Sequence, residues 1–148
     1  MSEPVGPEVT HSADRLEIAE LFARYAWGMD RVDLEMFLGV WTDDAEWIAD
    51  GAPIRCVGRD AISEYVDRTA ATRAPTPDPG SSVRLVGSPS ITFEGPDAAR
   101  ARSEMTAFTY TVSAIVPYSL GYYDDALVRE SGRWLIRRRH MVVCTALP

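Results

Sequence analysis

The feature that most constrains the fold is a change of hydrophobic period about half-way along the chain. In the first half, apolar residues recur at helical spacing, as at Leu21, Phe22 and Tyr25. Beyond residue 80 the pattern is that of long strands, broken by turn residues at 94–97 and 131–132. Helices first and hairpin-linked strands second predict an α+β fold, in which a curved antiparallel sheet carries its helices on one face.

Three helices are expected in the first half of the chain, with a strand at 45–49 and a short strand at 54–57 between the second and the third. Asp14 and Glu17 have the spacing of a capping box, which predicts a first helix that runs on through Ile18. Asp33 is placed to cap a second, shorter helix. The sequence Gly58-Arg59-Asp60 opens a third helix. The proline-rich segment 74–80 reads as a stiff, extended loop between this helix and the sheet.

We expect one domain, from 13 to 148, preceded by a flexible N-terminus at 1–12. A chain of 148 residues with 46% hydrophobic content can bury a sizeable core. The net charge of −7 disfavours nucleic acids and anionic membranes as partners. No N-terminal signal and no apolar run of membrane-spanning length is visible, so we expect a soluble, cytoplasmic protein.

The two cysteines have no partners at metal-ligand spacing. Cys56 and Cys144 lie in apolar surroundings, which is typical of packed free thiols rather than of a disulfide framework or a zinc site. We therefore expect no metal site at these cysteines.

The strand predicted at 98–110 has one face of mostly small residues. Such a face on the helix-covered side of a sheet either lets a helix pack closely or leaves an open pocket, and the pattern favours neither. The residues on this face are Ala99, Ala101, Ser103, Met105 and Ala107.

Several short motifs follow one another along the chain. They are Tyr25-Ala26-Trp27-Gly28-Met29-Asp30, Trp41-Thr42-Asp43-Asp44-Ala45-Glu46-Trp47, Gly58-Arg59-Asp60-Ala61-Ile62, Tyr123-Asp124-Asp125 and Gly132-Arg133-Trp134-Leu135-Ile136. In this order they resemble the SnoaL-like family, which includes dehydratases, polyketide cyclases, ketosteroid isomerases and a hexachlorocyclohexane dehydrochlorinase, together with non-catalytic subunits. The resemblance implies a cone-shaped fold whose three helices pack on the concave face of the sheet and enclose an apolar cavity.

The resemblance assigns a catalytic role to Asp30. In the dehydratase and dehydrochlorinase branch, an aspartate at the end of the first helix orients a strand histidine that removes a proton from the substrate. Asp30 matches that aspartate, but the matching strand segment, 81–87, contains no histidine. His140 or Arg84 remains as the orienting partner, and Asp30 itself becomes the expected acid or base. A plain helix-terminal role for Asp30 stays open.

Other candidate residues carry hydroxyl groups or aromatic rings. Tyr25 matches the tyrosine with which ketosteroid isomerase binds an enolate oxygen, although a tyrosine on an apolar helix stripe is also typical of core. With Asp30 and His140 it completes the expected catalytic set. We expect substrate contacts from Trp41, Trp47, Arg84, Met105, Tyr110, Tyr118 and Tyr123.

Two charged strand segments allow further interpretations. Arg102 and Glu104 resemble the arginine and acid of limonene-type epoxide hydrolases, but they also fit a solvated strand face or an oligomer interface. The run 137–139 consists of three arginines, which fits a strand with alternate solvent-facing charges, although one arginine can reach inward to a buried carboxylate.

The function expected from the sequence is that of a cofactor-independent lyase or isomerase of the dehydratase or cyclase type. It would act by acid–base catalysis on a small hydrophobic, cyclic or polyketide-like substrate. The alternatives are a non-catalytic small-molecule-binding or assembly subunit, and an epoxide hydrolase of the limonene type. Because the outer face of an open sheet is exposed, we expect a homodimer.

Overall fold

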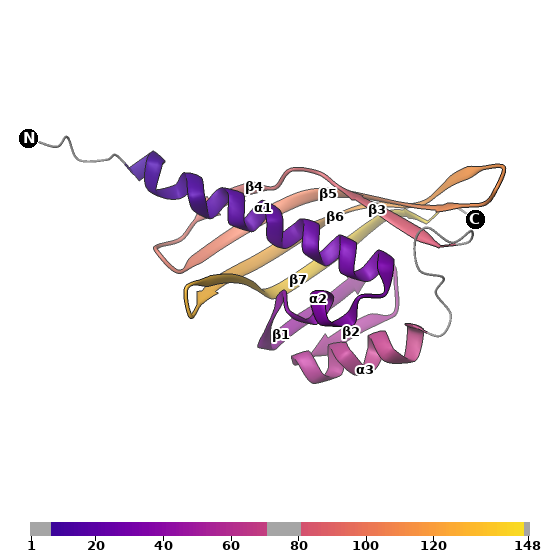
Figure 1. Cartoon of the computed structure of the whole chain (residues 1–148), viewed down its shortest axis with the longest axis horizontal. Helices are drawn as coiled ribbons and strands as arrows, with labels where there is room; N and C mark the ends of the chain where they lie inside the picture. The colour runs from indigo at the N-terminus through magenta and orange to yellow at the C-terminus, as the bar shows by residue number, and fades with distance from the viewer. Residues whose placement is uncertain (1–6, 71–80, 147–148) are drawn as a thin grey trace, which may run out of the picture.

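The computed structural model describes residues 7–70 and 81–146, and shows a long helix lying across one face of a sheet (Figure 1). The proline-rich segment 74–80 lies outside the described residues. The helices are α1 (Pro7–Arg31), α2 (Leu34–Leu38) and α3 (Arg59–Ala70). The strands are β1 (Trp41–Asp50), β2 (Ile54–Val57), β3 (Ser82–Val86), β4 (Ser90–Phe93), β5 (Ala98–Tyr110), β6 (Ile115–Glu130) and β7 (Arg133–Ala146).

The strands form one curved, open sheet, as the change of hydrophobic period predicts. Its order is β2-β1-β7-β6-β5-β3, and β4 pairs with β5 beside β3. The pairings of β3 to β7 are antiparallel, in agreement with the prediction. The pairing between β1 and β7 is parallel, which the sequence did not predict. This parallel pairing joins the first half of the chain to its last strand.

The core lies between α1 and the concave face of the sheet. The α1 side chains of Ile18, Leu21, Phe22 and Tyr25 are almost completely buried. The predicted inner face of β5 faces them, since every residue from Ala99 to Ala107 on that face is buried. Small side chains on β5 therefore let the large aromatic residues of the neighbouring elements fill the interior.

The first helix begins earlier than its capping-box pattern predicts. It starts at Pro7, so Asp14 and Glu17 lie inside the helix and do not cap it. Trp134 uses both carboxylates: its indole Nε1–H donates to Asp14 at 3.0 Å, and its backbone N–H donates to Glu17 at 3.0 Å. These carboxylates fasten α1 to the first residues of β7. Among the described residues, no helix is long and apolar enough to span a membrane.

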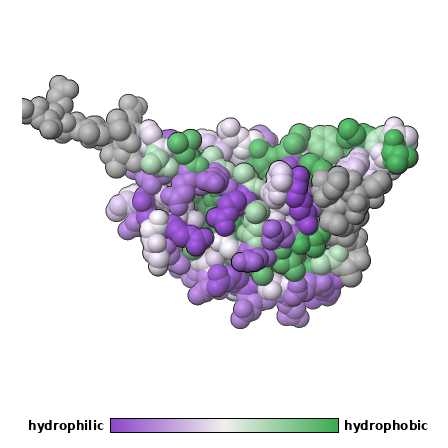
Figure 2. All heavy atoms as spheres, in the orientation of Figure 1, coloured by the Kyte–Doolittle hydropathy of each residue, from purple (hydrophilic) through white to green (hydrophobic). Residues whose placement is uncertain are grey.

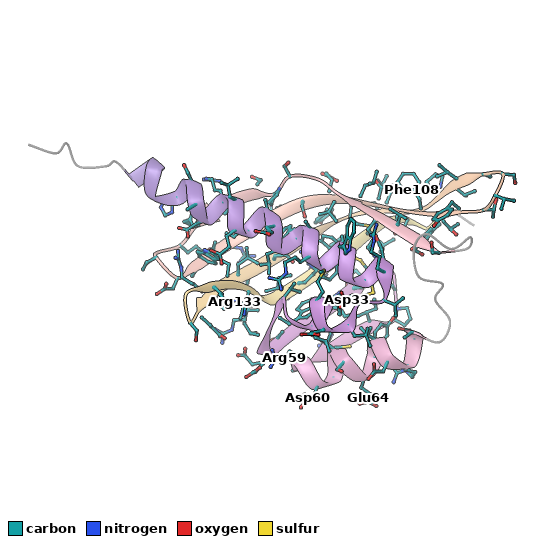
Figure 3. The ribbon with its side chains drawn as sticks, in the orientation of Figure 1. Asp33, Arg59, Asp60, Glu64, Phe108 and Arg133 are labelled. Atoms are coloured by element: carbon teal, nitrogen blue, oxygen red, sulfur yellow. The ribbon has the colours of Figure 1, made fainter. Side chains whose placement is uncertain are left out.

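A tight joint between α1 and α2 fixes the end of α1. Val32 adopts a positive φ of 58°, and the Asp33 N–H donates to the Gly28 carbonyl at 2.8 Å. Asp33 then caps α2 as predicted, with its side chain accepting from the Met36 N–H at 3.0 Å (Figure 3). A Cβ atom on Gly28 would lie 2.8 Å from the Phe37 nitrogen. Only glycine allows this close approach, which holds the last turn of α1 in place.

Candidate functional site

Asp30 and Arg84 form a buried ion pair where the last turn of α1 meets β3. Asp30 is 5% exposed. Its Oδ1 accepts a hydrogen bond from the Arg84 guanidinium, and its Oδ2 accepts from the Arg84 backbone N–H at 2.7 Å. One residue thus holds both oxygens of the carboxylate. Of the two partners predicted for Asp30, the structure brings Arg84 to it.

Burial and Arg84 shift the pKa of the Asp30 carboxyl in opposite directions. Loss of solvation raises the pKa of the Asp30 carboxyl above its ordinary value, and the charge and hydrogen bonds of Arg84 offset part of the rise. Although burial opposes the charge on Arg84, the nearby groups of Tyr123, Asp30 and Tyr25 hold the pKa of its guanidinium above the ordinary value. A carboxyl with a raised pKa can both accept and return a proton.

An aromatic cluster occupies the interior beside this ion pair. The Tyr25 ring lies edge-on to Trp41, Trp47 and Tyr123, at centroid distances of 5.8, 6.3 and 5.6 Å. All four side chains are almost fully buried. The predicted residues Tyr25, Trp41, Trp47 and Tyr123 therefore belong to one cluster. Each of them is also part of the hydrophobic core.

A second buried ion pair, Asp125 with Arg139, lies against the same cluster. The two side chains are fully buried, and Asp125 accepts from Arg139 Nε at 2.8 Å and Nη2 at 2.7 Å. The guanidinium carbon lies 3.9 Å from the Tyr123 ring centroid and 4.1 Å from that of Tyr25. Burial raises the pKa of Asp125 while Arg139 opposes the rise. The two tyrosines thus lie between two carboxylate–arginine pairs.

Burial dominates the acidity of Tyr123. It holds the pKa of the Tyr123 hydroxyl well above the ordinary value, because the nearby Tyr25 adds to the rise and the charges of Arg139 and Arg84 only partly oppose it. The hydroxyl group therefore keeps its proton near neutral pH and can serve as a hydrogen-bond donor.

The remaining predicted contacts lie at the edge of this region. The Tyr118 hydroxyl donates to Ser82 Oγ at 3.1 Å, next to Arg84 on β3. Met105 is buried on the inner face of β5. Tyr110, at the end of β5, is partly exposed. The β3–β5 register places Met105 opposite Val86 and Ala107 opposite Arg84, and Tyr110 directly follows Thr109, the partner of Ser82.

The structure does not bring His140 to Asp30. His140 follows the inward-facing Arg139 on β7, so its side chain points to the opposite, outer face of the sheet. There its Nε2 lies 2.7 Å from the carboxylate of Asp50. Arg102 and Glu104 are exposed on the same outer face, where Arg102 pairs with Asp124 at 3.3 Å. Neither His140 nor this arginine and acid lies within the concave face.

An open groove leads to the first ion pair from outside. It runs between α1 and β3, has a volume of about 460 Å³, and reaches Phe22, Asp30 and Arg84. Trp27, which is 53% exposed, lies at the groove beneath the guanidinium of Arg31. The ion pair is therefore accessible from this side, consistent with the 18% exposure of the Arg84 side chain.

The donor atoms of the region suit oxygen-bearing ligands rather than metal ions. Within residues 11–70 and 81–144, no three His, Cys, Asp or Glu side chains converge as metal ligands. The available groups are two arginines paired with carboxylates, tyrosine hydroxyls and indole N–H groups. Such groups bind and orient carbonyl or hydroxyl oxygens.

Sequence reasoning missed Asp125 as a site residue and could not choose among the three arginines of 137–139. Asp125 stands beside Asp124, and only the alternation of β6, with Tyr123, Asp125 and Leu127 buried, marks it as inward-facing. Of the two interpretations of this run, the structure supports the one in which an arginine reaches inward to a buried carboxylate, and that residue is Arg139.

Comparisons with known proteins agree with this geometry. The family model for the SnoaL-like domain matches residues 10–140. No curated protein matches the chain. A solved structure of a protein of unknown function from Mycobacterium tuberculosis, an aspartate-to-asparagine variant, is 26% identical; the match covers 98% of this chain and 80% of that one, with a TM-score of 0.82.

Two further solved structures show the same fold at lower identity. A candidate scytalone dehydratase from Novosphingobium aromaticivorans is 18% identical, with a TM-score of 0.80 over 95% of this chain and 90% of that one. The β subunit of a candidate aromatic-ring-hydroxylating dioxygenase from the same organism is 19% identical, with a TM-score of 0.76 over 93% and 94%. Since the family model covers most of the chain, including both ion pairs and the aromatic cluster, the protein belongs to the SnoaL-like family.

Proposed function

We propose that the protein is a cofactor-independent lyase or isomerase of the dehydratase or cyclase type, acting on a small hydrophobic, cyclic or polyketide-like substrate. The observation that carries the proposal is the buried carboxylate of Asp30. It is held by Arg84, lies beside tyrosine hydroxyls, and is reached by an open groove. A carboxyl with a raised pKa in such surroundings is suited to proton transfer.

The proposed reaction begins with proton abstraction next to a carbonyl group. The Asp30 carboxylate accepts the proton from carbon, and the electron pair moves to the carbonyl oxygen as an enolate. A tyrosine hydroxyl, from Tyr25 or Tyr123, donates a hydrogen bond to that oxygen. In a dehydration, the carbonyl re-forms, the electron pair forms a double bond between the α and β carbons, and the C–O bond at the β carbon breaks. The leaving hydroxide takes the proton from Asp30 to become water.

Arg84 takes the orienting role in this proposal. Its side chain and backbone N–H groups fix both carboxylate oxygens, and its charge favours the ionised form of Asp30 that the first step needs. His140 was the other candidate for this role. It has no part in the proposal, because it pairs with Asp50 on the outer face.

A non-catalytic binding or assembly subunit is the second candidate function. The similarity to a dioxygenase β subunit supports it, as does the strand segment 81–87, which has no histidine. Both functions predict that the protein binds hydrophobic ketones, and only the first predicts turnover. We do not favour the epoxide hydrolase alternative. Its expected arginine and acid, Arg102 and Glu104, are exposed on the outer face of the sheet.

The test is turnover of cyclic ketones and hydroxyketones by the wild-type protein and by Asp30→Asn. The amide keeps the size of the side chain but cannot accept the proton, so turnover should fall by about two to four orders of magnitude. Asp33→Asn is the matched control, because asparagine caps a helix as well as aspartate does. Full turnover in a folded Asp30→Asn variant would refute the proposal. Binding without turnover in the wild-type protein would favour the subunit function.

A further inference from the structure

The groove between α1 and β3 contains a positive charge that no carboxylate balances. It lies where the end of α1 runs beside β3 (Figure 1), and its charged residues are Asp30, Arg31 and Arg84. Asp30 and Arg84 pair with each other. The Arg31 guanidinium forms no hydrogen bond or ion pair within the described residues, and lies over the Trp27 ring, 3.2 Å from the ring centroid. The groove is therefore locally positive, although the whole chain carries a net charge of −7.

Trp27 holds the Arg31 guanidinium at the groove. The two residues are four positions apart on α1, so their side chains lie on the same face of the helix. An arginine that stacks on an aromatic ring keeps the N–H groups at its edge free to donate, and these form a planar fork that matches a carboxylate. Because the stack restricts the Arg31 side chain, less conformational freedom is lost when a ligand binds.

The place of Arg31 in the last turn of α1 has a structural reason as well. A cation there interacts favourably with the partial negative charge at the end of the helix. This interaction uses the charge of the guanidinium, and the contact with Trp27 uses its face. Both leave the N–H groups of Arg31 available to a ligand. A purely structural role predicts no preference for an anion, so a binding experiment can separate the two roles.

The walls of the groove suit an apolar ring system. Its volume of about 460 Å³ lies in the range of pockets that bind small molecules. On the helix side the walls consist largely of small side chains, which leave room for a ligand, and on the strand side they are largely aliphatic. The wall residues of these two kinds are Ala19, Ala23 and Ala26 on α1, and Val83, Leu85, Val86 and Pro89 on and after β3.

One unbalanced arginine favours a ligand with a single negative charge. A carboxylate carries one charge, whereas a phosphate monoester carries close to two at neutral pH and would leave an excess in an acidic chain. The charge of Arg31 also reaches Asp30, where it is one of the effects that oppose the raised pKa of the carboxyl. A ligand carboxylate on Arg31 would weaken that effect, and would so make Asp30 a stronger base.

We propose that the substrate is an apolar ring compound that bears one carboxylate group, which pairs with Arg31 while the ring system lies between α1 and β3. The inference rests on the proposed function in placing the reacting carbon at Asp30, next to Arg31 in the sequence. Arg31 is then a specificity-determining residue that binds the substrate, and Trp27 is a positioning residue that acts through Arg31.

Two probes of the same shape test the requirement for a negative charge. 2-Naphthoate carries a carboxylate, and 2-naphthamide replaces it with a neutral amide. Isothermal titration of the wild-type protein at low ionic strength should show 2-naphthoate binding at least about tenfold more tightly, the size of a charge-assisted hydrogen bond that is partly exposed to solvent. The preference should shrink in high salt. Equal affinities, tighter binding of the amide, or no binding of either probe would overturn the proposal.

The variant Arg31→Gln removes the charge and should reduce the preference for 2-naphthoate by about tenfold. Arg31→Lys keeps the charge and should keep part of the preference. Arg24→Gln is the matched control: it removes the same charge from the same helix, but Arg24 lies near Gly39 at the end of α2 and outside the groove. An unchanged preference in Arg31→Gln, whatever its melting temperature, would show a purely structural role and contradict the proposal, as would an equal loss in Arg24→Gln.

The binding test is independent of catalysis. Asp30→Asn should keep the preference for 2-naphthoate or increase it, because the variant removes a negative charge beside Arg31. If Asp30→Asn keeps full turnover while the preference depends on Arg31, the acid–base proposal fails and the binding inference stands. If the preference is absent while turnover depends on Asp30, the binding inference fails alone.

Discussion

Asp30 and Asp125 are both buried carboxylates paired with arginine, but only Asp30 is reached from outside. Asp125 and Arg139 have no exposed surface, and a bidentate pair of hydrogen bonds fixes them. Asp30 borders the groove between α1 and β3. An enclosed pair is suited to holding neighbouring groups in place, and an accessible one to exchanging protons with a substrate.

The Asp125 pair should contribute more to stability than its exposed neighbour does. Asp125→Asn leaves the charge of Arg139 buried and uncompensated, which should lower the free energy of unfolding by about 3–5 kcal/mol. Asp124→Asn, one residue away on the outer face, breaks only surface pairs with Arg100 and Arg102 and should cost about 0–1 kcal/mol. Urea unfolding of both variants measures the difference. Equal losses would contradict the structural role given to Asp125.

The raised pKa of Asp30 predicts a specific dependence of stability on pH. Between the ordinary pKa of 3.8 and the raised folded value, the folded state binds more protons than the unfolded state, so stability falls as pH rises through this window. Asp30→Asn mimics the protonated form, and Arg84 differs from the fully buried Arg139 because its side chain is 18% exposed at the groove and keeps contact with solvent when the carboxylate is removed. It should therefore melt no lower than the wild type at pH 7, and any advantage should shrink as pH falls towards 4. A wild type that melts higher at pH 7 would show that the carboxylate is a structural anchor.

At the scale of the elements, hydrophobic period predicted the strands but not their irregularities. Alternation from the buried Trp134 and Ile136 on β7 would place Arg138 inward. The β6–β7 register shifts between Ala126 and Leu127, and Arg137 is the extra residue. This bulge reverses the alternation, so Arg139 faces inward and His140 outward. Because a bulge depends on the partner strand, the single sequence could not choose between the three arginines.

The start of α1 shows a second limit of local patterns. Asp14 and Glu17 have the spacing of a capping box, yet they accept hydrogen bonds from Trp134, more than a hundred residues later. Asp33, which has the same kind of local signal, does cap α2. Asp14 and Glu17 lie inside a helix that begins at Pro7 and contact a distant strand, and a local pattern contains no such tertiary contacts.

The close approach of α2 to Gly28 at the end of α1 predicts that alanine at this position lowers the stability of the protein. Alanine in place of glycine normally stabilises a helix by about 1 kcal/mol. At Gly28 the added Cβ would lie 2.8 Å from the Phe37 nitrogen, so α2 must move away from α1. We expect Gly28→Ala to lower the free energy of unfolding by about 1–3 kcal/mol, as measured by denaturant unfolding. Increased stability would show that the joint does not constrain the end of α1.

At the scale of the whole molecule, the hydrophobic period predicted helices packed on one face of a sheet. The resemblance to the SnoaL-like family predicted the fold. The first helix placed Asp30 correctly at its end, and the second half supplied Arg84 and Tyr123 to the same region. The parallel pairing of β1 with β7 could not be read from either segment, because it joins residues about 90 positions apart. That pairing places Asp50 next to His140, and the two side chains pair on the outer face of the sheet.

The homodimer expected from the sequence remains a proposal. Apolar side chains gather around the β5–β6 hairpin, where Ile115, Val116 and Leu120 are exposed (Figure 2). We expect light scattering at micromolar concentration to give twice the chain mass of 16.4 kDa. Leu120→Glu should shift the mass to that of the monomer, whereas Leu16→Glu, on the exposed side of α1, should not. A wild-type protein of monomer mass would remove the proposal.

The central claim is that the carboxylate of Asp30 moves a proton next to a carbonyl group. Deuterium incorporation from D₂O into a bound cyclic ketone, followed by NMR, reports this step directly and needs no complete turnover. We predict that the wild-type protein accelerates the exchange and that Asp30→Asn, with unchanged ketone affinity, loses about two to four orders of magnitude of the rate. The same rate in both proteins, with the ketone bound equally well, would contradict the claim.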